Sequence, residues 1–167
     1  MNAPIVVTAL FAAADQAWFD SLRRAHYPAE RNRLPAHLTL FHHLPPSQAA
    51  EVKHRLSLET HGVARPPATL REPYSLGSGV AWRIESAALA DIRARLGEAF
   101  AGLLVPQDMA GWRPHVTIQN KVAPDTARAL LAAMRAGFRA RPVTITGLAA
   151  WWYRDGRWEP LSRHMFG

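Results

Sequence analysis

The sequence predicts an α+β fold made of two matched halves. Segments with strand-type and helix-type periodicity alternate along the chain, and residues 37–85 are approximately repeated by residues 115–161. No low-complexity segment divides the sequence. Its 167 residues, 49% of them apolar, suffice for one domain with a substantial core and exclude wholesale disorder. We therefore expect a single bilobal domain over residues 1–167.

In the first half, apolar periodicity and turn residues define the elements. Residues 3–11 are rich in β-branched and apolar side chains, which is typical of a buried strand. The next segment has helical spacing and ends at Pro28, because proline disfavours helical geometry at the residue before it. Pro45 and Pro46 stop the following strand and begin another helix, and a Gly-Ser-Gly turn at 77–79 joins two further strands. The expected elements are a strand at 3–11, a helix at 15–26, a strand at 37–44, a helix at 47–60 and strands at 66–76 and 80–85.

The second half repeats this alternation. Leu89, Ile92 and Leu96 recur at helical spacing, so an amphipathic helix is expected after the strand pair. An Asp-Gly dipeptide at 155–156 between two apolar runs is a strong hairpin signal. The expected elements are a helix at 86–103, a strand at 115–122, a helix at 125–136 and hairpin strands at 143–153 and 157–161.

Several sequence features recur in the same order in the two halves. His37-Leu38-Thr39-Leu40 recurs as His115-Val116-Thr117-Ile118, and a proline stands nine residues after each histidine. Each copy continues with a helix, a Pro-x-Thr-apolar run and a tryptophan-bearing strand that follows a glycine turn. The matched runs are 67–70 with 142–145 and 79–85 with 156–161. Such agreement is not easily produced by chance, so we infer a duplication.

The composition favours an anionic partner. Lys and Arg number 20 against 13 for Asp and Glu, a formal charge of +7 that suits nucleotides, RNA or phosphorylated metabolites. The absence of cysteine excludes a disulfide scaffold, a Cys-ligated zinc site and a thiol nucleophile. No apolar run is long enough to span a membrane, and no basic segment precedes the first one as in a secretory signal. We expect a cytoplasmic protein without membrane attachment or an obligate protein partner.

The doubled His-x-Thr motif is expected to bring two imidazoles and two hydroxyls around one cleft. Side chains alternate along a strand, so His37 shares a face with Thr39, and His115 shares a face with Thr117. Two imidazoles can serve as general base and general acid, and two hydroxyls can donate hydrogen bonds to phosphate oxygens. This set suits attack on a cyclic phosphodiester and requires neither a metal nor another cofactor. The two histidines are the candidate catalytic residues, and the two threonines are the candidate phosphate ligands.

Other site types fit the sequence less well. Neither motif histidine has a carboxylate or cysteine at ligand spacing, and the adjacent His42 and His43 would point to opposite faces of a strand, so no metal site is expected. A Gly-x-Ser-x-Gly elbow, a Walker motif and a dinucleotide fingerprint are absent. The alternative to an enzyme is a non-catalytic RNA- or nucleotide-binding module that uses the same cleft.

The two motifs resemble the paired signatures of the 2H phosphoesterase superfamily. The chain is most similar to the bacterial 2′,5′ RNA ligase-like branch, whose members are also described as RNA 2′,3′-cyclic phosphodiesterases. The likeness covers nearly the whole chain, including residues 147–151 and 156–161. It implies a bilobal fold in which two antiparallel sheets, flanked by helices, face each other across a central groove. It also implies hydrolysis of 2′,3′-cyclic phosphates to 2′-phosphates, with reversible 2′,5′ ligation in some members.

The resemblance also implies roles for individual residues. His37 and His115 become the acid–base pair, with the first histidine protonating the leaving 3′ oxygen and the second activating water. Thr39 and Thr117 become the phosphate ligands. The pseudo-symmetry of the motifs leaves the two histidine roles exchangeable on sequence alone. The implied partner is an RNA 3′ end with a 2′,3′-cyclic phosphate, or a small cyclic or 2′,5′-linked nucleotide.

The chain departs from the family pattern directly after both motifs. Residues 41–45 stand where many members have apolar residues and a glycine, and residues 119–121 replace a small residue followed by arginine. Strand alternation places several of these side chains in the groove, where Phe41 could stack on a nucleobase. The candidate substrate-binding residues are Phe41, His43, Gln119, Lys121 and Arg113.

Overall fold

The computed structural model describes residues 3–167 and shows the expected alternation of strands and helices. The strands are β1 (Ile5–Phe11), β2 (Leu38–Leu44), β3 (Pro67–Ser75), β4 (Val80–Glu85), β5 (His115–Gln119), β6 (Arg141–Arg154) and β7 (Arg157–Met165). The helices are α1 (Ala13–His26), α2 (Ala49–Thr60), α3 (Ala87–Ala99), α4 (Pro106–Met109) and α5 (Pro124–Ala136). The sequence pattern does not predict α4, and both α3 and β5 end earlier than expected. No helix within residues 3–167 is both long and apolar enough to cross a membrane.

All strand pairings are antiparallel, and the strands follow the order β2-β1-β6-β3-β4-β5, with β7 added to β6. The long strand β6 connects the two parts of this sheet, because its first residues pair with β3 and its later residues pair with β1 and β7. The expected mixed fold with antiparallel strands is therefore confirmed. A separation into two sheets is not confirmed, since β6 runs through both halves.

The strand order is symmetric. Exchanging β1 with β4, β2 with β5 and β3 with β6 gives the same order read backwards. The structural repeat therefore runs from β1 to β3 and from β4 to β6. The sequence repeat matches the strand after Gly79 with the strand after Gly156, and this match is wrong. β4 lies between β3 and β5 in the strand order, whereas β7 pairs with β6 and stands off this order. The strand that lies between the two corresponding strands, β6 and β2, is β1, so β1 is the counterpart of β4.

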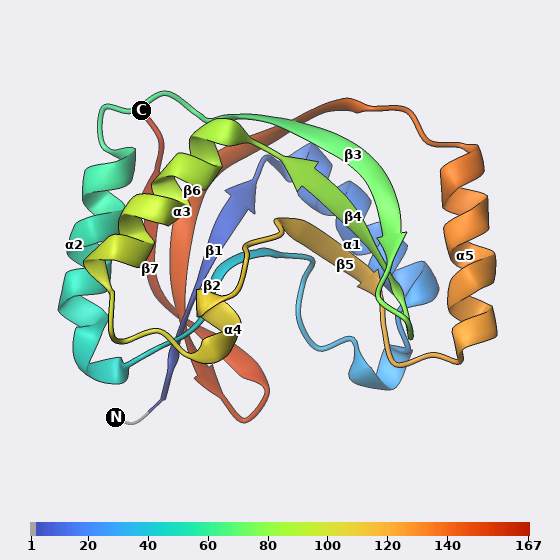
Figure 1. Cartoon of the computed structure of the whole chain (residues 1–167), viewed down its shortest axis with the longest axis horizontal. Helices are drawn as coiled ribbons and strands as arrows, with labels where there is room; N and C mark the ends of the chain where they lie inside the picture. Colours follow the sequence, from blue (N-terminus) through green and yellow to red (C-terminus); the bar gives the residue numbers. More distant parts are fainter. Residues whose placement is uncertain (1–2) are drawn as a thin grey trace.

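Each half contributes a helix to the other. α1 follows β1 but packs against β5, and Trp18 of α1 contacts Trp82 of β4 with ring centroids 5.5 Å apart. α3 follows β4 but lies beside α2, where Arg95 forms an ion pair with Glu59 at 2.8 Å. Figure 1 shows α2 and α3 side by side at the left and α5 at the right. This exchange brings α1 next to the second His-x-Thr strand and α3 next to the first.

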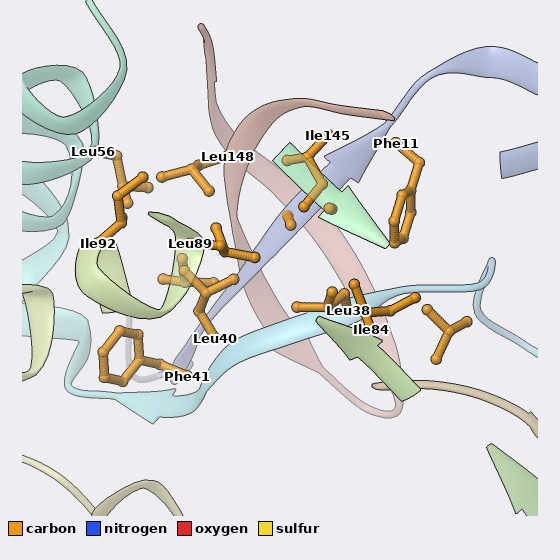
Figure 2. Packing of buried hydrophobic residues seen from close by; sticks show 14 of the residues in the cluster. Phe11, Leu38, Leu40, Phe41, Leu56, Ile84, Leu89, Ile92, Ile145 and Leu148 are labelled. Carbon is orange, nitrogen blue, oxygen red and sulfur yellow. The ribbon is translucent and has the colours of Figure 1, made fainter. Parts of the chain in front are cut away.

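The core lies between the sheet and these helices. Figure 2 shows Leu56 of α2 and Ile92 and Leu89 of α3 gathered over Leu40 and Phe41 of β2. These five side chains are 0–3% exposed. Burial of such a side chain contributes roughly 1.5–3 kcal/mol. The first motif strand is thus packed against helices from both halves of the chain.

Candidate active site

The two motif histidines have the same local geometry. Nδ1 of His37 lies 2.8 Å from the carbonyl oxygen of Pro35, and Nδ1 of His115 lies 2.6 Å from the carbonyl oxygen of Arg113. Because a carbonyl oxygen only accepts, each Nδ1 must carry a proton and donate it. In the neutral ring, Nε2 is then left as an acceptor. The backbone two residues upstream therefore selects the same tautomer in both motifs.

The surroundings of the two rings differ. His37 packs against Trp158 with ring centroids 4.5 Å apart, whereas Tyr74 meets His115 edge-on at 6.0 Å. Burial by the surrounding protein lowers the pKa of His37 to about 4, and the nearby charges of Arg23 and His115 act in the same direction, while a backbone hydrogen bond opposes them. His37 is therefore neutral at pH 7, and His115 is close enough to influence it electrostatically.

Residues from opposite halves meet in one cavity. His37 and Thr117 line a cavity of about 280 Å³ together with Arg23 of α1. Arg23 is 4% exposed and donates from Nη1 to the carbonyl oxygen of Thr117 at 2.9 Å. In the other motif, Trp112 donates from Nε1 to the carbonyl oxygen of Thr39 at 3.0 Å. The backbone of each threonine is thus anchored by a side chain from the opposite half.

A bulge lies at the same place in both motif strands. Between β1 and β2 the register shifts after Thr39, so Leu40 is an extra residue on β2. Between β4 and β5 the register shifts after Thr117, so Ile118 is an extra residue on β5. Each bulge stands three residues after its motif histidine. A bulge interrupts the alternation of side chains between the two faces of a strand.

The bulges overturn the expected positions of Phe41 and Gln119. Phe41 is fully buried, packs edge-on against Phe100 at a centroid distance of 6.5 Å and lies 4.2 Å from the guanidinium carbon of Arg93. Gln119 is 3% exposed, and its Oε1 has no hydrogen-bond partner among the described residues. Neither side chain faces the groove, so the structure contradicts stacking of a nucleobase on Phe41.

The other three candidate substrate contacts are exposed. The buried carboxylate of Asp108 in α4 accepts hydrogen bonds from the backbone N–H groups of His42 and His43 at 2.9–3.0 Å, and His42 also donates from Nδ1. Lys121 follows β5, and Arg113 precedes it.

Within residues 3–167, no three His, Asp or Glu side chains gather in a way that could hold a metal ion.

A family model spans most of the chain. The model of the 2′-5′ RNA ligase superfamily matches residues 11–157, a range that includes both His-x-Thr motifs. The chain belongs to the 2′-5′ RNA ligase superfamily. This result confirms the family that the motifs resemble, and it supports an enzyme that acts on phosphodiester bonds. Comparison with curated proteins gives no significant match.

Solved structures share the fold of this superfamily member. E. coli LigT in complex with 3′-AMP is 18% identical, with a TM-score of 0.58 and 99% of each chain covered. TT0787 of Thermus thermophilus is 14% identical, with a TM-score of 0.64 and coverage of 98% of this chain and 97% of the other. E. coli LigT in complex with NADP+ is 16% identical, with a TM-score of 0.62 and coverage of 99% and 98%. At these identities the likeness concerns the fold alone.

Sequence reasoning missed the side chains that hold the superfamily motifs in place. Asp20 of α1 accepts a hydrogen bond from the backbone N–H of Ala36 at 2.8 Å, and Gln16 donates to the Ala36 carbonyl oxygen at 2.9 Å. In the sequence, these residues and Arg23 look like the solvated face of an amphipathic helix. One signal was available in the sequence, because Arg23 stands four residues after the apolar Phe19 and therefore lies on the same helix face.

Proposed function

We propose that the protein is a metal-independent phosphodiesterase that opens the 2′,3′-cyclic phosphate of RNA or of a nucleotide to a 2′-phosphate. The observation that carries this proposal is the doubled histidine geometry, in which a backbone carbonyl binds each Nδ1–H and Nε2 is left for proton transfer. Thr39 and Thr117 would donate their hydroxyls to the phosphate oxygens. E. coli LigT has been solved with 3′-AMP and with ATP, which supports a nucleotide ligand for this fold.

The reaction needs one proton removed and another supplied. The oxygen of water attacks phosphorus while Nε2 of one imidazole accepts a proton from that water. The bond between phosphorus and the 3′ oxygen breaks, and the Nε2–H of the other, protonated imidazole protonates the leaving oxygen. The bond to the 2′ oxygen remains, so the product is a 2′-phosphate. If a 5′-hydroxyl takes the place of water, the same step forms a 2′,5′ linkage and is reversible.

The protonation state of His37 favours it as the base. Burial lowers the pKa of His37 to about 4, and its single ring proton at pH 7 is donated from Nδ1 to Pro35. Such a ring can accept a proton on Nε2 but has none to give there. We therefore assign water activation to His37 and protonation of the leaving oxygen to His115. This is the reverse of the roles that the sequence resemblance implies.

Removal of either imidazole should strongly reduce the rate of turnover. Hydrolysis of nucleoside 2′,3′-cyclic phosphates in EDTA, with the 2′- and 3′-phosphate products resolved, should give the 2′-phosphate with the wild type. His37→Ala and His115→Ala should each lose about 10²–10⁴-fold in rate while keeping the wild-type circular dichroism spectrum. His54→Ala removes an exposed histidine of α2 and is the matched control. Normal turnover by either motif variant would contradict the two-histidine mechanism.

The binding module without catalysis gives a different result in the same assay. It would bind a nucleoside 3′-phosphate with an affinity that falls as salt rises, because phosphate contacts release counterions. It would not hydrolyse the cyclic phosphate. Binding without turnover by the wild type would therefore favour the module over the enzyme.

A further inference from the structure

A second cavity adjoins the one that His37 and Thr117 line. It has a volume of about 620 Å³ and shares Arg31 and Arg33 with that first cavity. Lys121 lines it from the end of β5. Sites for small ligands commonly have volumes of about 300–1,000 Å³. The space beside the motifs therefore extends far enough on this side to hold a further group of the substrate.

Among residues 3–167, the cations of the second cavity form no ion pair with a carboxylate. None of the ion pairs within residues 3–167 includes Arg31, Arg33 or Lys121. Glu30 lines the same cavity but takes part in none of these pairs either. Positive charges that are brought together repel one another, and an anion between them relieves this repulsion. Guanidinium groups match the oxygens of a phosphate especially well.

In the other half of the fold, a carboxylate of the protein lies at the corresponding strand end. By the symmetry of the fold, the loop between α3 and β5 corresponds to the loop between α1 and β2. The first of these loops carries Asp108, which is 2% exposed and accepts hydrogen bonds from the backbone of His42 and His43 at the end of β2. The second brings Arg31 and Arg33 to the end of β5. The fold therefore places the Asp108 carboxylate at the end of β2 and the Arg31 and Arg33 guanidinium groups at the end of β5.

The backbone of Lys121 adds a further observation. Its φ of 63° lies in the left-handed region, which a residue with a side chain adopts at a cost of about 1–2 kcal/mol. The side-chain oxygen of Asn120 accepts a hydrogen bond from the Lys121 N–H at 2.9 Å. Conformations of this kind cluster at functional sites, where the surrounding structure enforces them.

We propose that Arg31, Arg33 and Lys121 form a subsite for a second phosphate group of the substrate. The proposal rests on the proposed function, because the phosphate between the motif histidines defines the neighbouring position. It assigns the protein to substrates with at least two phosphates, either an oligonucleotide with an internucleotide phosphate or a nucleotide with a 5′-phosphate. Contacts to phosphate position a ligand without reading its base, so the preference is independent of base identity.

Binding of stable 3′-phosphates tests the subsite without any need for turnover. Dissociation constants of adenosine 3′-monophosphate, adenosine 3′,5′-bisphosphate and the 3′-phosphorylated dinucleotide ApAp are measured by calorimetry at one salt concentration. Wild type should bind at least one two-phosphate ligand roughly 10- to 100-fold more tightly than the monophosphate, as expected for charge-assisted contacts. A gain for the bisphosphate alone identifies a terminal phosphate, and a gain for ApAp alone identifies an internucleotide phosphate.

The variants separate the subsite from general charge. Arg31→Gln/Lys121→Gln should reduce the preference to near unity. The control Arg65→Gln/Arg139→Gln removes the same charge from exposed positions that line none of these cavities, and it should keep the preference. Equal affinity of wild type for all three ligands, or an unchanged preference in the first variant, would overturn the subsite. A preserved preference in a protein that hydrolyses no cyclic phosphate would leave the subsite standing and overturn the proposed reaction.

Discussion

Burial decides the protonation of His37, and the His-x-Thr motif alone does not reveal it. An ordinary histidine titrates near pH 6.5, but burial against Trp158 and its surroundings lowers the pKa of His37 to about 4. If His37 accepts the proton of water, loss of this base should lower kcat/KM only as the pH approaches about 4, and kcat/KM should not decline between pH 7 and that point. A profile of kcat/KM for a cyclic nucleotide measures this.

Folding stability provides a control that is independent of catalysis. Between pH 6.5 and about 4, the unfolded chain binds a proton at this ring that the folded protein does not bind. The free energy of unfolding should therefore fall as pH falls through this window, and His37→Gln should lack that part of the decrease. A decline of kcat/KM that already begins near pH 6.5 would contradict the assignment of His37 as the base.

Helix α1 positions the first motif through its polar side chains. Asp20 binds the N–H of Ala36 at 2.8 Å, directly before His37, so Asp20→Ala should misplace the imidazole and lower kcat by about 10- to 100-fold with little change in KM. Asp20→Asn keeps an acceptor oxygen and should recover most of this loss. Asp15 of the same helix binds the N–H of Thr144 at 2.8 Å, so Asp15→Ala should lower the melting temperature but not kcat. Equal kcat values for Asp15→Ala and Asp20→Ala would contradict the role of Asp20 in positioning His37.

The strands show how far the sequence could predict this site. Periodicity placed every strand, and the doubled motif placed His37 and His115 at corresponding positions of a symmetric fold. Periodicity could not place Phe41 or Gln119, because a bulge depends on pairing with a neighbouring strand and leaves no mark in the alternation itself. The sequence also could not predict the hydrogen bonds of Asp20 and Arg23, since they join segments that only the folded chain brings together.

The two halves of the molecule share one strand and exchange helices, so neither half is closed without the other. β6 pairs with β3 along its first residues and with β1 along its later ones. α1 packs on β5, and Arg93 of α3 donates from Nε to the carbonyl oxygen of Leu40 in β2 at 3.0 Å. Loss of either half would expose apolar surface of the other, which favours a single cooperative unfolding transition.

Gly147 of β6 allows a test of this coupling. A Cβ atom there would come within 2.6 Å of the His164 carbonyl oxygen in β7, so Gly147→Val should displace β7 and destabilise the fold by about 1–3 kcal/mol. In urea, far-UV circular dichroism and tryptophan fluorescence should report the same midpoint for wild type, because the shared strand couples the two halves. Fluorescence reports on both halves, since Trp18 and Trp151 lie in different halves. Both probes should shift together in the variant. Separate midpoints, or a shift of only one probe, would mean that the halves unfold independently despite their common strand.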